Sequence, residues 1–340
     1  MYTNRTSVPN ASNRSLPPAA GIETAILRTV AYVDVFNYPL TAAQVHRYLE
    51  GVSASREEIE AILANGRLIP DRLSRLDGYF TLPGREEIVA ARQAREVVSQ
   101  RLWPRAIRYG RLLARLPFVR MVAVTGSLTM NNAEADADID YLVVTECGRL
   151  WLCRAFIIAL VRLARRDGVE LCPNYILSED ALKFPDHNLY VAHEITQMVP
   201  LSGLNVYQRI RQLNAWADEL LPNAAGPPYH PDPVSPGLHQ SLVERPLRTP
   251  VGRWLEQWEM NRKIRKLRAQ ETEFTETDFC ADWCKGHFDA YNRPTMRAYQ
   301  LTITNYQLPQ TKSQLPITPN QEPNSNHQSP ITHNPPPTEQ

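Results

Sequence analysis

Apolar side chains recur at helical spacing in the first part of the chain and at strand spacing in its middle. Helical spacing covers Ile22 to Val35, then Thr41 to Leu49, and then a stretch that begins near Ser53 to Ser55 and runs through Leu63. Thr41 is the expected N-cap of the second helix. Between Leu73 and Leu82, apolar residues flank Asp77-Gly78, a pair that is typical of a β-hairpin turn.

Three helices followed by a hairpin resemble a winged helix, so we expect a winged-helix-like module over residues 21–85. In DNA-binding proteins of this kind the recognition helix lies in the major groove. Here the third helix opens with Glu57, Glu58 and Glu60, which would face phosphates, whereas phosphate contact requires clustered lysine and arginine. A scaffold or a partner-binding module is favoured over a reader of DNA.

The middle of the chain holds apolar runs that predict buried strands. Met121 to Val124 ends in Thr125-Gly126-Ser127, and a second run extends from Asp138 to Val144. An amphipathic helix is expected from Arg149 to Arg166, and a third strand from Val169 to Leu177. Strands among helices predict an α+β fold, in which a mixed sheet with flanking helices is preceded by the helical module and followed by a helical C-terminal region.

Asp138 and Asp140 alternate with apolar residues at the start of the second run. Because successive side chains of a strand point to opposite faces, the two aspartates share one face, with β-carbons roughly 6–7 Å apart. Two converging carboxylates can share divalent cations that assist an in-line phosphoryl displacement. Hard oxygen ligands favour Mg²⁺ or Mn²⁺ over zinc. Upstream, Gly126 allows the backbone to approach an anion, and the Ser127 hydroxyl can donate to phosphate oxygens.

An apolar strand, Gly126-Ser127, ten residues (128–137) and then Asp138-Ile139-Asp140-Tyr141 resemble the signature of the DNA polymerase β-type nucleotidyltransferase superfamily. Its small members include minimal and aminoglycoside nucleotidyltransferases. The resemblance implies transfer of a nucleoside monophosphate from an NTP to an acceptor hydroxyl, with Mg²⁺ held by Asp138 and Asp140 and the nucleotide bound at Gly126 and Ser127. The Arg-Gly that often follows Gly-Ser in the family is absent, because this chain continues as Leu128-Thr129.

The resembled family usually carries a third carboxylate on a later strand. Glu170 lies between apolar neighbours at the start of the third strand, and we expect it to be the third catalytic and metal-binding carboxylate. Its alternative role is an exposed charge at the strand end, and Pro173 implies an edge or a bulge that leaves the register open. Asn174 is then the substitute ligand. Asp136 is interpreted as a solvated loop residue.

Three other functions compete with a nucleotidyltransferase. A catalytically silent protein of the same fold would sense nucleotide or serve as a scaffold. A winged-helix regulator would bind duplex DNA through residues 21–85. A glycosyltransferase would use its Asp-x-Asp motif to hold a sugar nucleotide through Mn²⁺. The acceptor stays unknown, with an antibiotic, a protein side chain, an RNA end and a small metabolite all open.

Composition narrows the partners. The net charge of +1 gives no global electrostatic signal for nucleic acid or membrane, so nucleic acid is not favoured as a partner. No segment is apolar and long enough to span a bilayer, and membrane is not expected. Five cysteines without disulfide-framework spacing indicate a reducing, cytoplasmic setting. The arginines of residues 85–116 are interpreted as a solvated helix face.

The predicted domain organisation runs as six segments: 1–20 disordered, 21–85 the winged-helix-like module, 86–221 the nucleotidyltransferase core, 222–250 a proline-rich linker, 251–303 a helical region and 304–340 a disordered tail. Within the core, His193, Glu194 and Gln197 are polar positions that could line an acceptor pocket, with His193 a weak general-base candidate. The basic stretch 262–268 is the best candidate for contact with a polyanion, although acidic residues follow it directly. Cysteines and a histidine within 280–287 raise the alternative of zinc, but a second ligand pair is missing.

Overall fold

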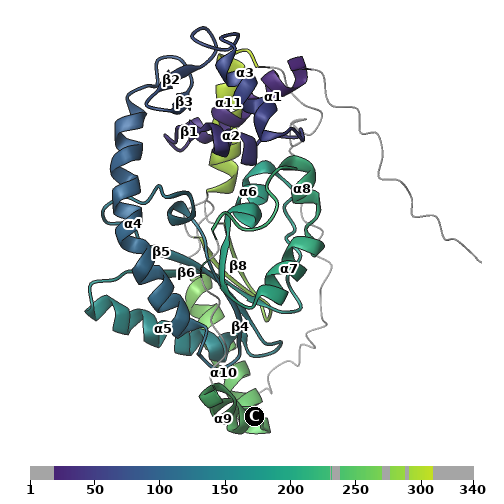
Figure 1. Ribbon diagram of the computed structural model, residues 1–340. Coiled ribbons are helices and arrows are strands. Elements are labelled where there is room, and N and C mark those ends of the chain that lie inside the picture. Colours follow the sequence, from purple (N-terminus) through teal and green to yellow (C-terminus); the bar gives the residue numbers. More distant parts are fainter. Residues whose placement is uncertain (1–18, 230, 232–237, 270–275, 288–290, 309–340) are drawn as a thin grey trace, which may run out of the picture. The chain divides into compact units, whose positions relative to one another are not determined.

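The computed structural model describes residues 19–229, 231, 238–269, 276–287 and 291–308. It has an α+β fold with a six-stranded mixed sheet, a three-stranded antiparallel sheet and flanking helices (Figure 1). The predicted α+β class is thereby confirmed. The segments 1–20 and 304–340, which the sequence predicts to be disordered, lie mostly outside the described residues, but residues 19–20 and 304–305 are helical.

The N-terminal module combines three helices with the small sheet. Its elements are α1 (Ala19–Asp34), β1 (Leu40–Thr41), α2 (Ala42–Arg47), α3 (Arg56–Ala64), β2 (Ser74–Leu76) and β3 (Tyr79–Thr81). The strand order is β1-β3-β2, and both pairs are antiparallel. The predicted hairpin around Asp77-Gly78 is confirmed, since Leu76 pairs with Tyr79 across it.

Local capping explains where two of these helices begin. The side chain of Thr41 accepts from the Gln44 amide while Gln44 reaches back to the Thr41 backbone, and Ser55 and Glu58 form the same reciprocal pair. Each capping box satisfies two amides that a helix N-terminus otherwise leaves without partners. The N-cap predicted at Thr41 is confirmed, as is the start of the third helix near Ser55.

The large sheet is built by strands from three separate parts of the chain. Its members are β4 (Val119–Val124), β5 (Ile139–Thr145), β6 (Leu171–Ser178), β7 (Val199–Ser202), β8 (Glu276–Phe279) and β9 (Trp283–His287). They lie in the order β7-β4-β5-β6-β9-β8, and only β5 and β6 run parallel to each other. The three central strands are those that the apolar runs predict.

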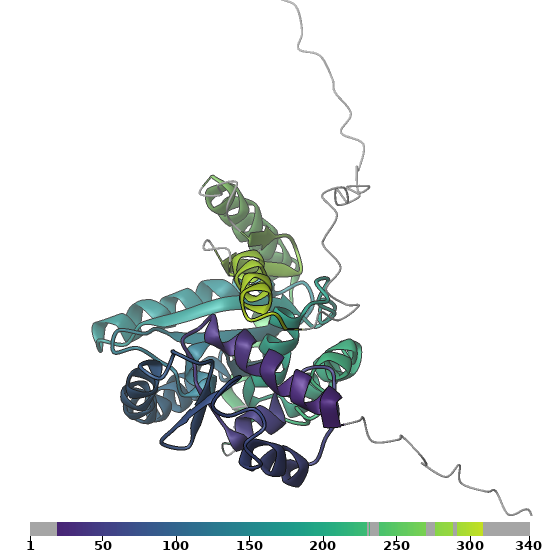
Figure 2. The ribbon, with the colours of Figure 1, turned by 90° about the horizontal axis from the view of Figure 1, so that it is seen from above.

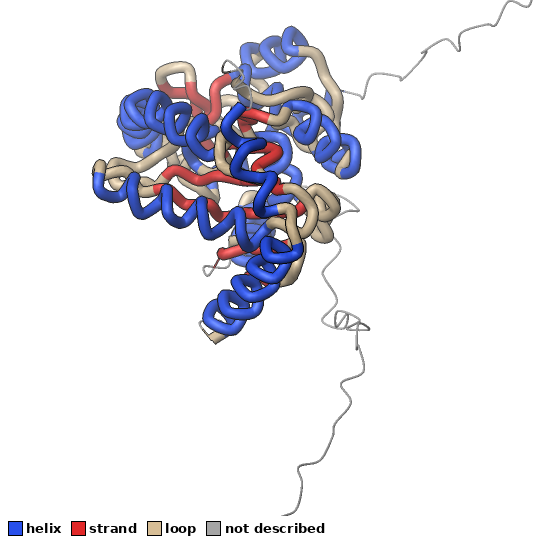
Figure 3. Tube along the Cα trace, turned by 90° about the horizontal axis from the view of Figure 1, so that it is seen from below, coloured by secondary structure: helices blue, strands red, loops and turns tan. Residues whose placement is uncertain are grey.

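Helices cover both faces of this sheet, so its central strands are apolar on both sides. One face packs against α4 (Ile88–Leu113), α5 (Leu150–Arg166) and α10 (Pro250–Arg268), and Figure 3 shows α5 running along the sheet. The other packs against α6 (Leu189–Gln197) and α7 (Leu204–Leu213). Short α8 (Trp216–Leu220) follows α7 and contacts α6.

The last helix returns to the first. α11 (Asn292–Asn305) lies beside α1 in both Figure 1 and Figure 2. Between them, Arg28 pairs with Glu50, and the Tyr299 hydroxyl donates to the same carboxylate. The three side chains are buried, and their mutual hydrogen bonds offset the loss of water. The N-terminal module is thus joined to the C-terminal part of the described chain.

Two segments differ from their predicted structure. The segment 222–250, predicted as a linker, contains α9 (Leu238–Leu247), and the region 251–303, predicted as helical, contains β8 and β9. β9 pairs with β6, whose edge would otherwise leave amides and carbonyls without partners. β6 and β9 are more than a hundred residues apart in the sequence, so local periodicity cannot predict that they pair. None of the described helices has the length and apolar run needed to cross a bilayer.

Glu256 on α10 fixes the start of α5. Its two carboxylate oxygens accept from the Trp151 and Leu152 amides at 2.8 and 2.7 Å, where the positive end of the helix dipole favours an anion. We expect Glu256→Ala to lower the free energy of unfolding by about 1–3 kcal/mol, because two buried amides lose their acceptor. Urea denaturation followed by circular dichroism measures it. Gln257→Ala, exposed on the next position, is the control, and equal stability of the two variants would contradict the assignment.

Candidate active site

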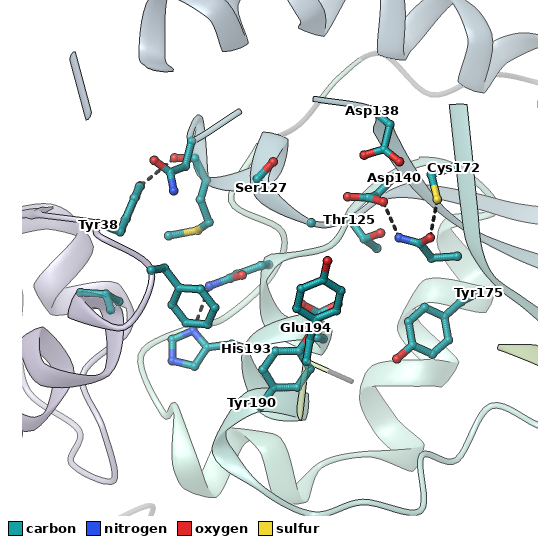
Figure 4. Close-up of a pocket in the computed structure, with 18 of the residues that line it drawn as sticks. Tyr38, Thr125, Ser127, Asp138, Asp140, Cys172, Tyr175, Tyr190, His193 and Glu194 are labelled. Carbon is teal, nitrogen blue, oxygen red and sulfur yellow. Dashed lines mark hydrogen bonds between the residues drawn. The ribbon is translucent and has the colours of Figure 1, made fainter. Parts of the chain in front are cut away.

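Asp138 and Asp140 meet at the end of β5 that faces the N-terminal module. Asp138 directly precedes the strand and Asp140 is its second residue, so the two side chains emerge on one face, as their spacing predicts. Figure 4 shows both carboxylates at one end of a cavity. Within the described part of the chain, neither forms an ion pair with lysine or arginine.

Gly126 packs directly against this pair. It follows β4 with φ of +67°, a conformation that favours glycine, and a β-carbon there would overlap the Asp140 carboxylate. The sequence predicts that Gly126 allows an anion to approach the backbone. In the structure, Gly126 also leaves room for the Asp140 side chain. Ser127 comes next, is exposed and opens the short 3₁₀ helix η1 (Ser127–Met130).

The loop after Gly126 is held on two sides. Its own turn is closed by the Asn132 amide, which donates to the Ser127 carbonyl at 2.9 Å. From α4, Arg92 donates to the Asn131 carbonyl at 2.6 Å and Trp103 to the Asn131 side chain at 2.8 Å. From the N-terminal module, the Tyr38 hydroxyl donates to the Met130 carbonyl at 2.7 Å. The loop is therefore fixed before any ligand binds.

Glu170 is not in the group of metal-capable side chains that the aspartates form, although it lines a groove with Asp138, so its role as third carboxylate stays a prediction. Its exposed carboxylate accepts from Arg165 at 2.9 Å, and this hydrogen bond lowers the Glu170 pKa. Arg165 lies in the last turn of α5, five residues before Glu170, so the end of this helix places the guanidinium beside the Glu170 carboxylate. Among the described residues, the third metal-capable side chain is Cys172, with ligand atoms of Asp138, Asp140 and Cys172 within 4.8 Å of one another.

Strand register explains why Cys172 occupies this place. Asp140 pairs with Cys172 across β5 and β6, and the register shifts before Leu142 pairs with Tyr175, as Pro173 predicts. This bulge also turns Asn174 toward the pair, where its amide donates to Asp140 and its carbonyl accepts from the Cys172 thiol at 2.6 Å. Asn174, the predicted substitute, is thus beside the aspartates. Burial and the nearby aspartates hold the Cys172 pKa well above its ordinary value, so the thiol stays protonated.

The pKa of Asp140 reflects its burial and the neighbouring carboxylates. Burial, the charge of Asp138 and the charge of Glu194 raise its pKa to about 8, against the hydrogen bond from Asn174. A divalent cation between the two carboxylates would relieve this repulsion. Oxygen donors suit Mg²⁺, which typically takes one or two carboxylates and completes its shell with water and substrate phosphates. The residues present therefore fit Mg²⁺, which prefers the hard carboxylate oxygens of Asp138 and Asp140 to the Cys172 sulfur.

No family model, curated protein or solved structure matches the chain.

The aspartates close one end of a cavity of about 530 Å³. Aromatic and polar side chains line the remainder, many of them from elements far apart in the sequence (Figure 4). They are Tyr32, Phe36 and Tyr38 of the N-terminal module, Tyr175 of β6, Tyr190, His193, Glu194 and Gln197 of α6, and Tyr291. The sequence predicts His193, Glu194 and Gln197 of α6 as lining residues, but it predicts none of these aromatic residues. Long-range packing brings the aromatic side chains to the cavity.

Two neighbouring residues of α6 have opposite roles. His193 is buried, stacks on Tyr32 with ring centroids 4.3 Å apart and hydrogen-bonds to Gln197. Burial lowers its pKa to about 3, so it stays neutral and supports the cavity wall instead of acting as a base. Burial raises the pKa of Glu194 to about 7 against the attraction of Lys285. A carboxyl with that pKa can exchange a proton near neutral pH.

A groove of about 600 Å³ adjoins the cavity and shares Phe36, Ser127, Asn132 and Asp138 with it. Among the residues that line either space, Arg95 is the one lysine or arginine. It extends from α4, pairs with exposed Glu134 at 2.6 Å and approaches the Asn132 side chain at 3.5 Å. Arg95 therefore stands beside the Gly126-Ser127 loop, where the sequence lacks the arginine of the resembled family.

The cysteines outside this site give no second metal-capable group within the described residues. Cys280 is exposed and Cys284 is buried. The side chain of His287 lies outside what the structure describes. The zinc alternative for 280–287 therefore gains no support.

Proposed function

We propose that the protein is a Mg²⁺-dependent nucleotidyltransferase that moves a nucleoside monophosphate from an NTP to an acceptor hydroxyl and releases pyrophosphate. The observation that carries the proposal is the meeting of Gly126, Asp138 and Asp140 where a cavity and a groove join. The mixed sheet around β4, β5 and β6 is assigned to the nucleotidyltransferase type, and residues 21–85 to a winged-helix-like module.

Each group has a role in the transfer. The acceptor oxygen bonds to the α-phosphorus, the bond from that phosphorus to the pyrophosphate oxygen breaks, and the acceptor proton passes to Glu194, which replaces Glu170 as the candidate base. Asp138 and Asp140 would hold Mg²⁺, and its charge, when bound, would neutralise the phosphate oxygens. Gly126 keeps Asp140 in place, and Ser127 donates to the triphosphate.

Arg95 is the residue that we assign to the triphosphate in place of the missing family arginine. We expect Arg95→Ala to weaken NTP binding about ten- to a hundredfold, because a hydrogen bond to a charged group contributes about 1.5–3 kcal/mol. Titration calorimetry with a non-hydrolysable NTP and Mg²⁺ measures the affinity. Arg101→Ala, an exposed arginine on the same helix, is the control and should bind normally. Equal affinity of the two variants would rule out the assignment.

A catalytically silent nucleotide-binding protein is the second candidate. The specific observation in its favour is that Glu170 pairs with Arg165 and leaves a cysteine and an asparagine beside the aspartates. Such a protein would bind an NTP with Mg²⁺ but release no pyrophosphate. A DNA-binding regulator is less favoured, because Glu57 and Glu60 are exposed on α3.

The deciding experiment supplies the full chain with Mg²⁺, each of the four NTPs labelled on the α-phosphate, and a cell lysate. Labelled product together with pyrophosphate supports the transferase. NTP binding without either product supports the silent protein. Preferential Mn²⁺-dependent binding of UDP-glucose over UTP would instead support an Asp-x-Asp glycosyltransferase and overturn the proposal.

A further inference from the structure

The cavity of about 530 Å³ has two ends of different chemistry (Figure 4). At one end lie Asp138, Asp140 and the Gly126-Ser127 loop. At the other, aromatic rings surround Glu194. The adjoining groove, which contains Arg95, joins the cavity at Asp138. A transferase requires room for two substrates that meet at the metal-binding carboxylates, and these two spaces provide it.

The aromatic end is built before any ligand arrives. Tyr32 stacks on His193 and meets Tyr299 edge to face, with ring centroids 4.3 and 5.3 Å apart. The Tyr38 ring is covered by the Arg92 guanidinium at 4.5 Å, and its hydroxyl accepts from Arg92 at 3.1 Å. Tyr32 and Tyr38 are each 3% exposed and form a fixed base for this end, whereas the more exposed rings of Phe36, Tyr190 and Tyr291 present apolar faces to the cavity. Such faces suit the flat or apolar side of a ring in a small molecule.

The charges around this end restrict what can bind. No lysine or arginine is among the described residues that line the cavity, and its ionisable members besides tyrosine and cysteine are Asp138, Asp140, neutral His193 and Glu194. Lys285 lies beside this end, where it interacts with Glu194 and approaches the centroid of the Tyr175 ring at 5.7 Å. A phosphate on the acceptor would therefore meet a single lysine that already compensates Glu194, and it would face the carboxylates. An RNA end or another polyanion is therefore disfavoured, since binding of phosphate backbones depends on lysine and arginine.

Glu194 supplies the polar contact. The Glu194 side chain lines the cavity, and its carboxylate forms no hydrogen bond with another described residue. A carboxylate held in this way accepts from a hydroxyl or an amine. Glu194 and Asp140 line the same cavity, so an acceptor hydroxyl on Glu194 would share that space with the metal-binding carboxylates.

We infer that the aromatic end, formed by the N-terminal module and α6, binds the acceptor, and that the acceptor is a small ring-bearing alcohol without phosphate. This inference rests on the proposed transferase. It gives the N-terminal module a role in substrate binding through Tyr32, Phe36 and Tyr38. The NTP then occupies the groove, where Arg95 is the basic side chain among the carboxylates Glu134, Asp136, Asp138 and Glu170, so that its phosphates would depend on Mg²⁺ bound at Asp138.

The test divides a lysate into macromolecules and small molecules, and the small molecules into those that bind an anion exchanger and those that do not. Each fraction is incubated with the full chain, Mg²⁺ and α-labelled NTP. Labelled product from the unbound small-molecule fraction is expected. Label on RNA or protein, or only from the anion-exchanger eluate, would overturn the acceptor class while supporting the transferase. The absence of label from every fraction would remove the transferase proposal and this inference together.

Substitutions separate an acceptor site from a nucleobase site. Tyr190→Ala and Phe36→Ala are each expected to raise the apparent KM for the acceptor at least fivefold, as measured from rates over serial dilutions of the active fraction. The KM for NTP should stay within twofold. A rise in the KM for NTP instead would show that the nucleobase occupies the aromatic end. Tyr229→Ala removes an exposed ring outside both spaces and serves as the control. Circular dichroism confirms that each variant is folded.

Discussion

Replacement of Asp138 and Asp140 by asparagine is expected to abolish Mg²⁺-dependent pyrophosphate release, with a loss on the order of a thousandfold or more. The physical reason is charge: two carboxylates without a described basic partner are the groups able to hold the cation at the reacting phosphate. Loss of several kcal/mol of charge stabilisation corresponds to about that factor in rate. Release of pyrophosphate in a coupled phosphatase assay, over a range of Mg²⁺ concentrations, measures it.

Two controls make this result specific. Asp180→Asn changes an exposed aspartate that follows β6 and lines neither space, so its rate should stay within twofold of the unmodified protein. Gly126→Ala should resemble the aspartate variants, because its methyl group displaces the Asp140 carboxylate. Normal activity in the double asparagine variant would sink the proposed metal site.

The single substitution Asp140→Asn is expected to stabilise the protein in the absence of metal, although the double variant loses activity. Folding raises the Asp140 pKa from 3.8 to about 8, so the unfolded chain releases its proton more readily than the folded one. The carboxyl therefore destabilises the fold increasingly as pH rises from about 4 to about 8. In EDTA, Asp140→Asn should raise Tm at pH 8 and have little effect at pH 4. A Tm difference that is the same at both pH values would contradict this origin.

Local signals in the sequence predict much of the fold. Capping at Thr41 and Ser55 depends on residues three positions apart, and the hairpin depends on Asp77-Gly78 alone. The shared face of Asp138 and Asp140 follows from strand geometry and needs no tertiary contact. These features are predictable because the interactions that form them span only a few residues.

The remaining features depend on distant contacts. Glu170 and Cys172 are two positions apart, so periodicity cannot tell which one lies beside Asp140. The register of β5 and β6 decides it, because Asp140 pairs with Cys172. β9 joins the sheet by pairing with β6 from a hundred residues away. Tyr32 reaches the cavity only because α1 packs against α6. For these, the alternation and spacing of residues hold no information.

Glu194→Gln is expected to lower kcat about a hundred- to ten-thousandfold, the usual contribution of a positioned base, while the KM for NTP and the Mg²⁺ requirement change little. The glutamine keeps the shape of the side chain but cannot accept the acceptor proton. Initial rates between pH 5.5 and 9 measure the effect. Glu194→Asp retains a carboxylate and should keep a larger part of the activity than the glutamine variant. Equal loss in both would point to a structural role for Glu194.

The pH profile gives the decisive part of this prediction. Glu194 interacts electrostatically with Lys285 on β9, Asp140 on β5 and Tyr32 on α1. Burial among these groups leaves the pKa of Glu194 at about 7. Because the carboxylate form is the base, kcat should rise with pH through about 7 and then level off. Lys285→Met removes the charge that lowers this pKa, so the rising limb should move to higher pH. A limb that persists unchanged in Glu194→Gln would assign the base to another group.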